Sequence, residues 1–180
     1  MLYLLDASVL ITAKDSYYPL DTVPEYWDWL EYIASNGHVK LPREIFEEIK
    51  EGPDDQTKDL LFEWIQRPSI QQAIILNEEV DVSLVQKICN IGYAKDLTDV
   101  EVEEIGRDPF LIAYALKSPQ TRAVITSEVS KPSLKRHRRR VPDVCNSLGV
   151  NSYTPFELSK LLKFSTGWQK ALPIQPLENI

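Results

Sequence analysis

Four acidic side chains, widely separated in the sequence, follow or lie close to short apolar runs. Asp6 closes the run LYLL, and Glu128 lies two residues after Thr126 at the end of the run AVIT. Glu48 lies on a helical segment after a second strand-like run, and Asp108 opens the helical segment before AVIT. Loops and helix ends converge beyond the carboxyl ends of parallel strands. We therefore expect Asp6, Glu48, Asp108 and Glu128 to meet at one edge of a sheet.

Carboxylates gathered at such an edge repel one another. Their pKa values would rise, or the site would open, unless a cation neutralised them. Oxygen ligands alone favour Mg²⁺ or Mn²⁺, and such an ion can orient a phosphodiester, lower the pKa of an attacking water and stabilise the leaving oxygen. Among 27 Asp and Glu residues, most are surface groups or helix caps, and Asp108 before Pro109 is itself a predicted N-cap. The inference therefore depends on the four acids together.

The elements that would position these acids are short strands alternating with longer helices. We expect strands at 2–5, 38–42, 123–127 and 150–153, and helices at 8–13, 23–37, 43–52, 54–66, within 78–116, from Pro142 and at 154–164. This alternation predicts an α/β fold with a mostly parallel sheet of about four to five strands covered by helices. A chain of 180 residues is typical of one domain, which we place at 1–164, before a loosely ordered tail at 165–180.

Composition limits the class of protein. Apolar and charged fractions of 43% and 26% are those of a globular protein, and a net charge of -7 argues against non-specific coating of polyanions. Two cysteines without metal-site spacing, Cys89 and Cys145, indicate free thiols in a reducing compartment. The sequence has neither a signal-peptide pattern nor a long apolar span. We therefore expect a cytoplasmic protein without a membrane segment.

A basic run follows the third predicted strand in this otherwise acidic chain. Its cations are Lys131, Lys135, Arg136, Arg138, Arg139 and Arg140. The run can be a mobile solvated loop or a clamp for a substrate backbone, with a targeting signal as the weakest alternative. If all six cations met phosphates of a single strand, log K would fall against log salt with a slope of roughly -4; we expect fewer contacts. His137 is predicted as a solvated side chain of this loop, and His38 as a residue at a strand start.

The order of the motifs resembles that of the PIN-domain nucleases, which include the VapC-type toxins. The similar segments are YLLDASVLI, EEIKEG, DPFLIAYAL and VITSE, and the matching positions are Asp6 with Ser8, Glu48 before Ile49, Asp108, and Thr126 with Glu128. The family commonly has Asp at the position of Glu128. The segments YWDWLEYI and VPDVC are similar to a prokaryotic PIN-like branch of unknown function, in which the last acid is commonly Glu.

This resemblance, which covers about residues 2 to 153, implies a three-layer α/β/α PIN-like fold and cleavage of single-stranded RNA with Mg²⁺ or Mn²⁺. It implies metal ligation by Asp6, Glu48 and Asp108, with Glu128 binding directly or through water. Ser8 and Thr126 would orient a ligand or water, although small hydroxyls at turns are more often local caps. The resemblance also implies an antitoxin as partner and a homodimer, with the aromatic helix at 23–37 either in the dimer interface or in the core.

Two other functions compete with a metal-dependent endoribonuclease. The first is a binding module for RNA or protein, in which a PIN-like fold has lost its catalytic site. The second is a phosphohydrolase with an aspartyl nucleophile, which would need two aspartates at the end of the first strand, where this chain has Asp6-Ala7-Ser8. Asp143, after Pro142, is a weaker candidate ligand because it can serve only to begin a helix.

Overall fold

The computed structural model describes residues 1–52 and 59–167. Within them the strands β1 (Leu2–Leu5), β2 (Val39–Lys40), β3 (Arg122–Ile125) and β4 (Asn151–Tyr153) form one sheet of order β2-β1-β3-β4. All three strand pairs are parallel. The prediction of an α/β fold with a parallel sheet is confirmed, and the four strands lie where the apolar runs predicted them, although β2 is only two residues long.

The register of the strands brings their carboxyl ends to one edge. Leu5 pairs with Ile125, and Ile125 pairs with Tyr153. The residues that follow, Asp6 and Thr126, are therefore neighbours, and the Asp6 N–H donates to the Ile125 carbonyl at 2.9 Å. The edge predicted to gather the acids is built by this alignment.

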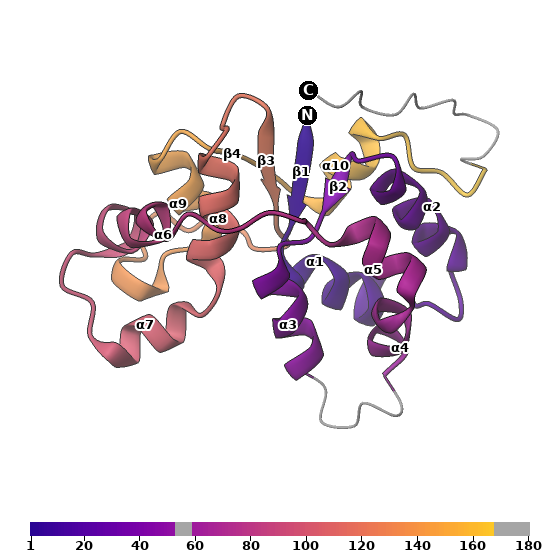
Figure 1. Ribbon diagram of the computed structural model, residues 1–180, viewed down its shortest axis with the longest axis horizontal. Helices are drawn as coiled ribbons and strands as arrows, with labels where there is room; N and C mark the ends of the chain where they lie inside the picture. The colour runs from indigo at the N-terminus through magenta and orange to yellow at the C-terminus, as the bar shows by residue number, and fades with distance from the viewer. Residues whose placement is uncertain (53–58, 168–180) are drawn as a thin grey trace.

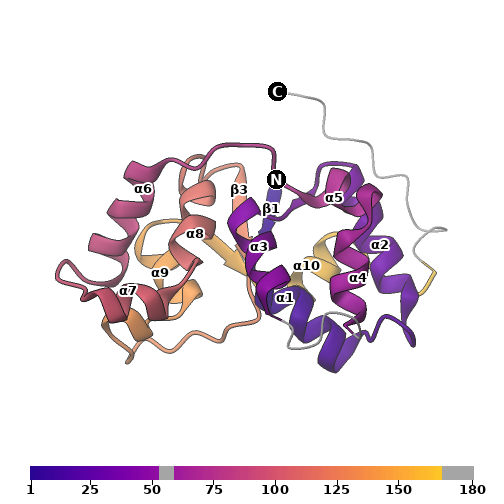
Figure 2. The same ribbon diagram turned by 60° about the horizontal axis from the view of Figure 1, so that its bottom comes forward.

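Helices cover the sheet on both sides. They are α1 (Ala7–Thr12), α2 (Pro24–Ser35), α3 (Arg43–Glu51), α4 (Leu60–Gln66), α5 (Pro68–Ile74), α6 (Val82–Lys87), α7 (Asp99–Ile105), α8 (Asp108–Leu116), α9 (Val141–Ser147) and α10 (Pro155–Leu161), with π-type turns η1 (Ala13–Tyr17) and η2 (Ile88–Tyr93) and a 3₁₀ turn η3 (Arg136–Arg138). Figures 1 and 2 show α6 to α9 gathered on one side of the sheet and α1 to α5 with α10 on the other. The arrangement has three layers, α/β/α.

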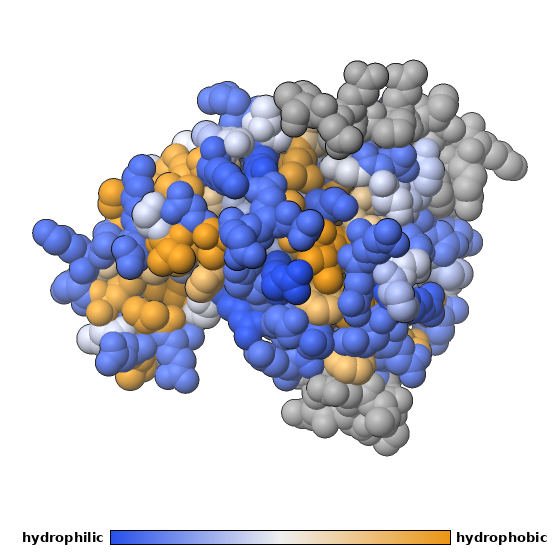
Figure 3. Space-filling model, viewed as in Figure 1, coloured by the Kyte–Doolittle hydropathy of each residue, from blue (hydrophilic) through white to orange (hydrophobic). Residues whose placement is uncertain are grey.

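The core combines the strands with an aromatic cluster on α2. Tyr26, Trp27 and Trp29 are almost fully buried, and the ring of Tyr26 stacks on that of Tyr18 with 4.2 Å between centroids. These side chains therefore pack inside the protein and are not available to an interface. Figure 3 shows apolar surface on the side of α6 and α7, elements that contain the exposed residues Val82, Val100 and Val102.

Several predicted boundaries shift. Asp108 is not the N-cap of its helix: Arg107 occupies that position and Asp108 is the first helical residue. The helix predicted from Pro142 begins at Val141. The helix predicted at 54–66 begins at Leu60, with Asp59 as its N-cap; residues 54–58 lie outside the described part. Helix α5 was not predicted.

The chain ends and the thiols are described in part. Residues 165–167 are exposed, and the rest of the predicted tail, 168–180, lies outside the described residues. Both cysteines are free thiols, as predicted; Cys145 is also buried, whereas Cys89 is only half-buried. No helix in the described residues has the length and apolar character that crossing a membrane requires.

Candidate functional site

Asp6 lies at the carboxyl end of β1, where its side chain is 7% exposed. It caps α1 by accepting from the Ser8 N–H, and its carboxylate also accepts from the Ser8 hydroxyl at 2.8 Å and the Thr126 hydroxyl at 2.5 Å. Burial raises the pKa of Asp6, and the two hydroxyl groups oppose that rise. Ser8 and Thr126 were predicted to orient a ligand or water. In the structure, both hydroxyls hold the carboxylate of Asp6.

Glu128 follows the end of β3 and turns toward α9. Its N–H donates to the Thr126 hydroxyl at 3.1 Å. Its carboxylate accepts from the Arg140 guanidinium at 2.8 Å and from the Val141 N–H at 2.7 Å. Both carboxylate oxygens of Glu128 are therefore already engaged by residues outside the predicted ligand set.

Asp108 stands in the first turn of α8 and bonds to a tyrosine that the motifs did not indicate. The Tyr93 hydroxyl, from η2, donates to its carboxylate at 3.3 Å. Burial raises the pKa of Asp108 to about 8, and the neighbouring charges of Asp6, Glu128 and Glu48 add to that rise, while the Tyr93 hydrogen bond opposes it. A tyrosine within an apolar helical stretch carries no sequence signal of such a contact, so Tyr93 could not be found without the fold.

Glu48 is the most accessible of the four acids. It projects from α3 and is exposed, so solvent screens its interactions. Its pKa is raised, first by the partial loss of water around it and then by the charge of Asp6, with Arg107 opposing the rise. Glu44, one turn earlier on α3, instead accepts from the Tyr114 hydroxyl at 3.4 Å.

The four predicted ligands, here called the acidic cluster (Asp6, Glu48, Asp108 and Glu128), therefore lie close enough for their charges to act on one another. In residues 1–52 and 59–167, no three His, Cys, Asp or Glu side chains stand in positions that would together hold a metal ion. The donor type alone fits a hard divalent cation, because all four side chains are carboxylates and three have raised proton affinity. Their side chains would have to draw together to bind one.

A cavity of about 370 Å³, here called the basic pocket, opens beside the acidic cluster. Asp108 and Glu128 line it, together with the cations Lys131, Arg138, Arg139 and Arg140. Four of the six cations of the basic run therefore lie beside the acids, whereas Lys135 and Arg136 line a different cavity of about 410 Å³.

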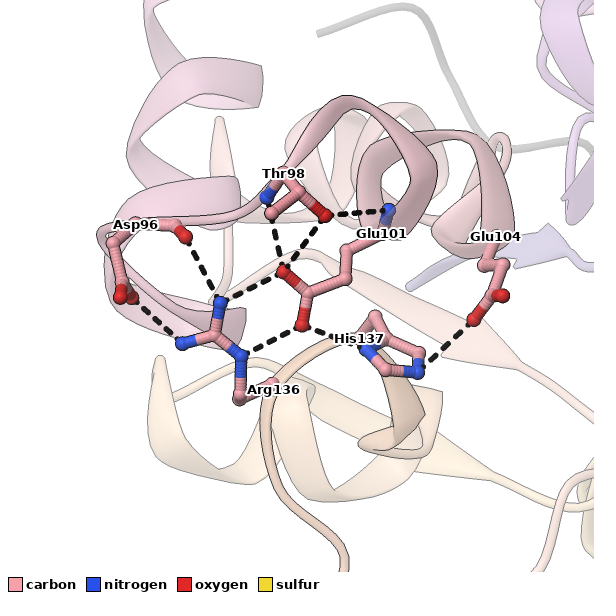
Figure 4. Close-up of polar contacts among 6 residues, drawn as sticks. All are labelled: Asp96, Thr98, Glu101, Glu104, Arg136 and His137. Atoms are coloured by element: carbon pink, nitrogen blue, oxygen red, sulfur yellow. Dashed lines mark hydrogen bonds and ion pairs between the residues drawn. The ribbon is translucent and has the colours of Figure 1, made fainter.

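Arg136 and His137 hold the basic loop, defined as residues 131–140, against α7 (Figure 4). Arg136 donates to both carboxylate oxygens of Glu101, at 2.6 and 2.7 Å, and to Asp96 at 2.7 Å. The His137 ring lies 3.0 Å from Glu101 and 3.0 Å from Glu104. The prediction of His137 as a solvated side chain is wrong, since α7 supplies it with two carboxylates.

Glu101 is itself held in place at the start of α7. It forms a capping box with Thr98, and the Arg136 guanidinium, followed by the Thr98 backbone, keeps the pKa of Glu101 below its ordinary value. Arg136, predicted to bind substrate, therefore has its guanidinium committed to α7. Its backbone also has a positive φ of 56°, which marks a tight turn.

The other end of the loop is tied to α9 by Asp143. This carboxylate accepts from the Ser130 hydroxyl at 2.5 Å and the Lys131 N–H at 2.7 Å, so Asp143 holds the loop and does not face the acidic cluster. Arg139 donates to the backbone carbonyls of Gly92 and Asp143. Arg138 is exposed at the rim of the basic pocket.

The fold and this site define a class: an α/β protein whose parallel sheet carries a partly buried acidic cluster at its carboxyl edge, beside a pocket lined by cations. A family described as a domain of unknown function, DUF4411, matches residues 3–166. The chain belongs to this family. No curated protein matches it.

Proposed function

We propose that this protein is a PIN-like endoribonuclease that uses Mg²⁺ or Mn²⁺ to cleave single-stranded RNA. The observation that supports this function best is the position of the basic pocket, which joins Asp108 and Glu128 of the acidic cluster to four cations. Carboxylates that can hold a divalent cation and guanidinium groups that can hold phosphates are the two requirements for hydrolysis of a phosphodiester.

The side chains divide this work. Asp6, Glu48 and Asp108 would hold the cation, and Glu128 would join them directly or through water. A bound divalent cation would supply Lewis-acid activation of a water and of the phosphodiester. Ser8 and Thr126 keep the carboxylate of Asp6 in one orientation. Without a cation, Asp108 retains a proton near neutral pH because its pKa is about 8.

The test is cleavage of a labelled single-stranded RNA by the full chain and by two isosteric variants. Asp6→Asn and Asp108→Asn should abolish cleavage while the circular dichroism spectrum stays unchanged. Asp28→Asn, an exposed position on α2, is the matched control and should cleave like the wild type. Undiminished cleavage by Asp6→Asn or Asp108→Asn would remove the proposed site.

The second candidate function is a PIN-like module that binds RNA or protein without cleaving it. The hydrogen bonds from Arg140 and Val141 to Glu128 favour this second function, because they occupy carboxylate oxygens that would otherwise bind a metal ion. Cleavage by the purified wild-type protein that EDTA abolishes would exclude this candidate.

A role as the toxin of a toxin–antitoxin pair, with an antitoxin as partner, is supported only by the resemblance to VapC-type proteins. Expression of the wild-type chain in a bacterial host should then arrest growth, and Asp6→Asn should relieve the arrest. Equal growth with both chains would contradict the toxin role, but it would not contradict metal-dependent cleavage of RNA.

A further inference from the structure

Arg140 contacts one member of the acidic cluster directly. Its guanidinium donates to Glu128 at 2.8 Å, with 48% and 24% of the two side chains exposed. Both side chains line the basic pocket, so a phosphate bound in this pocket would lie beside the ion pair. The carboxylate of Glu128 and such a phosphate would compete for the Arg140 guanidinium.

The rest of the basic loop is fixed by other contacts. Arg136 and His137 bind α7 (Figure 4), and Asp143 binds the opposite end of the loop. Arg139 is committed to two backbone carbonyls. Movement of Arg140 therefore requires only a change of its own side chain, with the loop remaining in place.

We propose that Arg140 is a positioning residue that exchanges Glu128 for a substrate phosphate. Binding of single-stranded RNA then frees one carboxylate oxygen of Glu128 for the acidic cluster, while the other oxygen keeps its hydrogen bond from the Val141 N–H. The inference rests on the proposed function. A guanidinium binds carboxylate and phosphate with the same paired donors, so the exchange replaces one charge-assisted contact by another. A partly exposed ion pair is weak, and the exchange is therefore readily reversible.

Two consequences follow for the affinities of the protein. The Glu128–Arg140 pair should weaken binding of a divalent cation in the absence of RNA, because Arg140 then occupies a carboxylate oxygen of Glu128 that could bind the cation. Since coupling between two ligands is reciprocal, RNA should raise the affinity for the cation, and the cation should raise the affinity for RNA. The substrate would then complete the site that acts on it.

The first experiment measures Mn²⁺ binding by electron paramagnetic resonance, without nucleic acid, on the full chain. Arg140→Gln should bind Mn²⁺ roughly two- to fivefold more tightly than the wild type, the range expected for loss of a partly exposed ion pair. Arg138→Gln removes the same charge from the same pocket without touching Glu128, so it controls for general electrostatics and should have a smaller effect. In a Glu128→Gln background, Arg140→Gln should no longer differ from Arg138→Gln.

The second experiment repeats the titration with a saturating single-stranded 2′-O-methyl oligoribonucleotide, checked on a denaturing gel to be intact. The oligonucleotide should raise the Mn²⁺ affinity of the wild type by a larger factor than that of Arg140→Gln. Equal factors, or equal effects of Arg140→Gln and Arg138→Gln in the first experiment, would overturn the exchange while leaving metal-dependent cleavage intact. A wild-type protein that neither binds Mn²⁺ nor cleaves RNA would overturn the proposed function together with it.

Discussion

Substitution of Asp108 by Asn tests how strongly the acidic cluster opposes folding when no cation is bound. The change keeps the shape of the side chain and removes its charge. Asp108 has a pKa of about 8 in the folded protein, against an ordinary value of 3.8. Between these values the folded protein holds a proton that the unfolded chain has lost, so the free energy of unfolding falls as pH rises from about 4 to about 8 and is flat above.

The size of this effect follows from the two pKa values. A carboxyl with these values contributes roughly 4 kcal/mol more stability at pH 5 than at pH 9. This is an upper limit, because Asp108 retains some contact with solvent. Asp108→Asn has no titrating group at this position, and at high pH it also removes a charge that faces those of Asp6, Glu128 and Glu48. The variant should therefore be the more stable protein at pH 9.

The assay is urea unfolding at pH 5, 7 and 9 in the presence of EDTA. The difference in unfolding free energy between Asp108→Asn and the wild type should grow with pH by several kcal/mol, while the control Asp28→Asn should follow the wild type at every pH. Parallel pH profiles for Asp108→Asn and the wild type would refute the inference that Asp108 is protonated in the folded, metal-free protein.

Four further outcomes are expected. Millimolar Mg²⁺ or Mn²⁺ should raise the melting temperature of the wild type, because the cation binds only the assembled carboxylates, and Asp6→Asn should show no such shift; equal shifts would contradict the site. Glu101→Gln should make the basic loop more sensitive to trypsin, and an unchanged digestion rate would show that α7 does not hold it. Gly92→Ala should destabilise the fold by about 1–3 kcal/mol, since a Cβ there would lie 2.7 Å from a Val144 methyl carbon; urea unfolding measures this, and an unaltered midpoint would contradict the packing. Arg138→Glu should weaken binding of single-stranded RNA and lower its salt slope by about 0.7, whereas an unchanged slope would place the RNA elsewhere.

The sheet and its acidic edge could be predicted because the signals are local. Apolar runs mark β1 and β3, and the parallel pairing that α/β alternation indicates puts Asp6 beside Thr126. The environment of Asp108 could not be predicted in the same way. An Asp before proline has the sequence pattern of a helix cap, and only the fold shows that the half-buried Asp108 lies beside Tyr93 and the other acids.

The contacts of the basic run could not be predicted from the sequence, for a different reason. Its charge is evident in the sequence, but the individual partners of its cations depend on residues distant in the chain. Glu101 lies 35 residues before Arg136, and Glu128 lies 12 residues before Arg140. Six similar side chains therefore have different surroundings, with Arg136 bound to α7, Arg140 bound to the acidic cluster and Arg138 at the rim of the pocket. Composition alone cannot distinguish them.

The separation of Asp6 and Thr126 by 120 residues has a consequence for the order in which the site forms during synthesis. Strand β1 is synthesised long before β3, and it cannot pair with β3 until residues 122–125 have been translated. Until then the nascent chain lacks both Thr126 and Glu128. For a protein proposed to cut RNA, this order keeps the site incomplete until synthesis has passed Glu128.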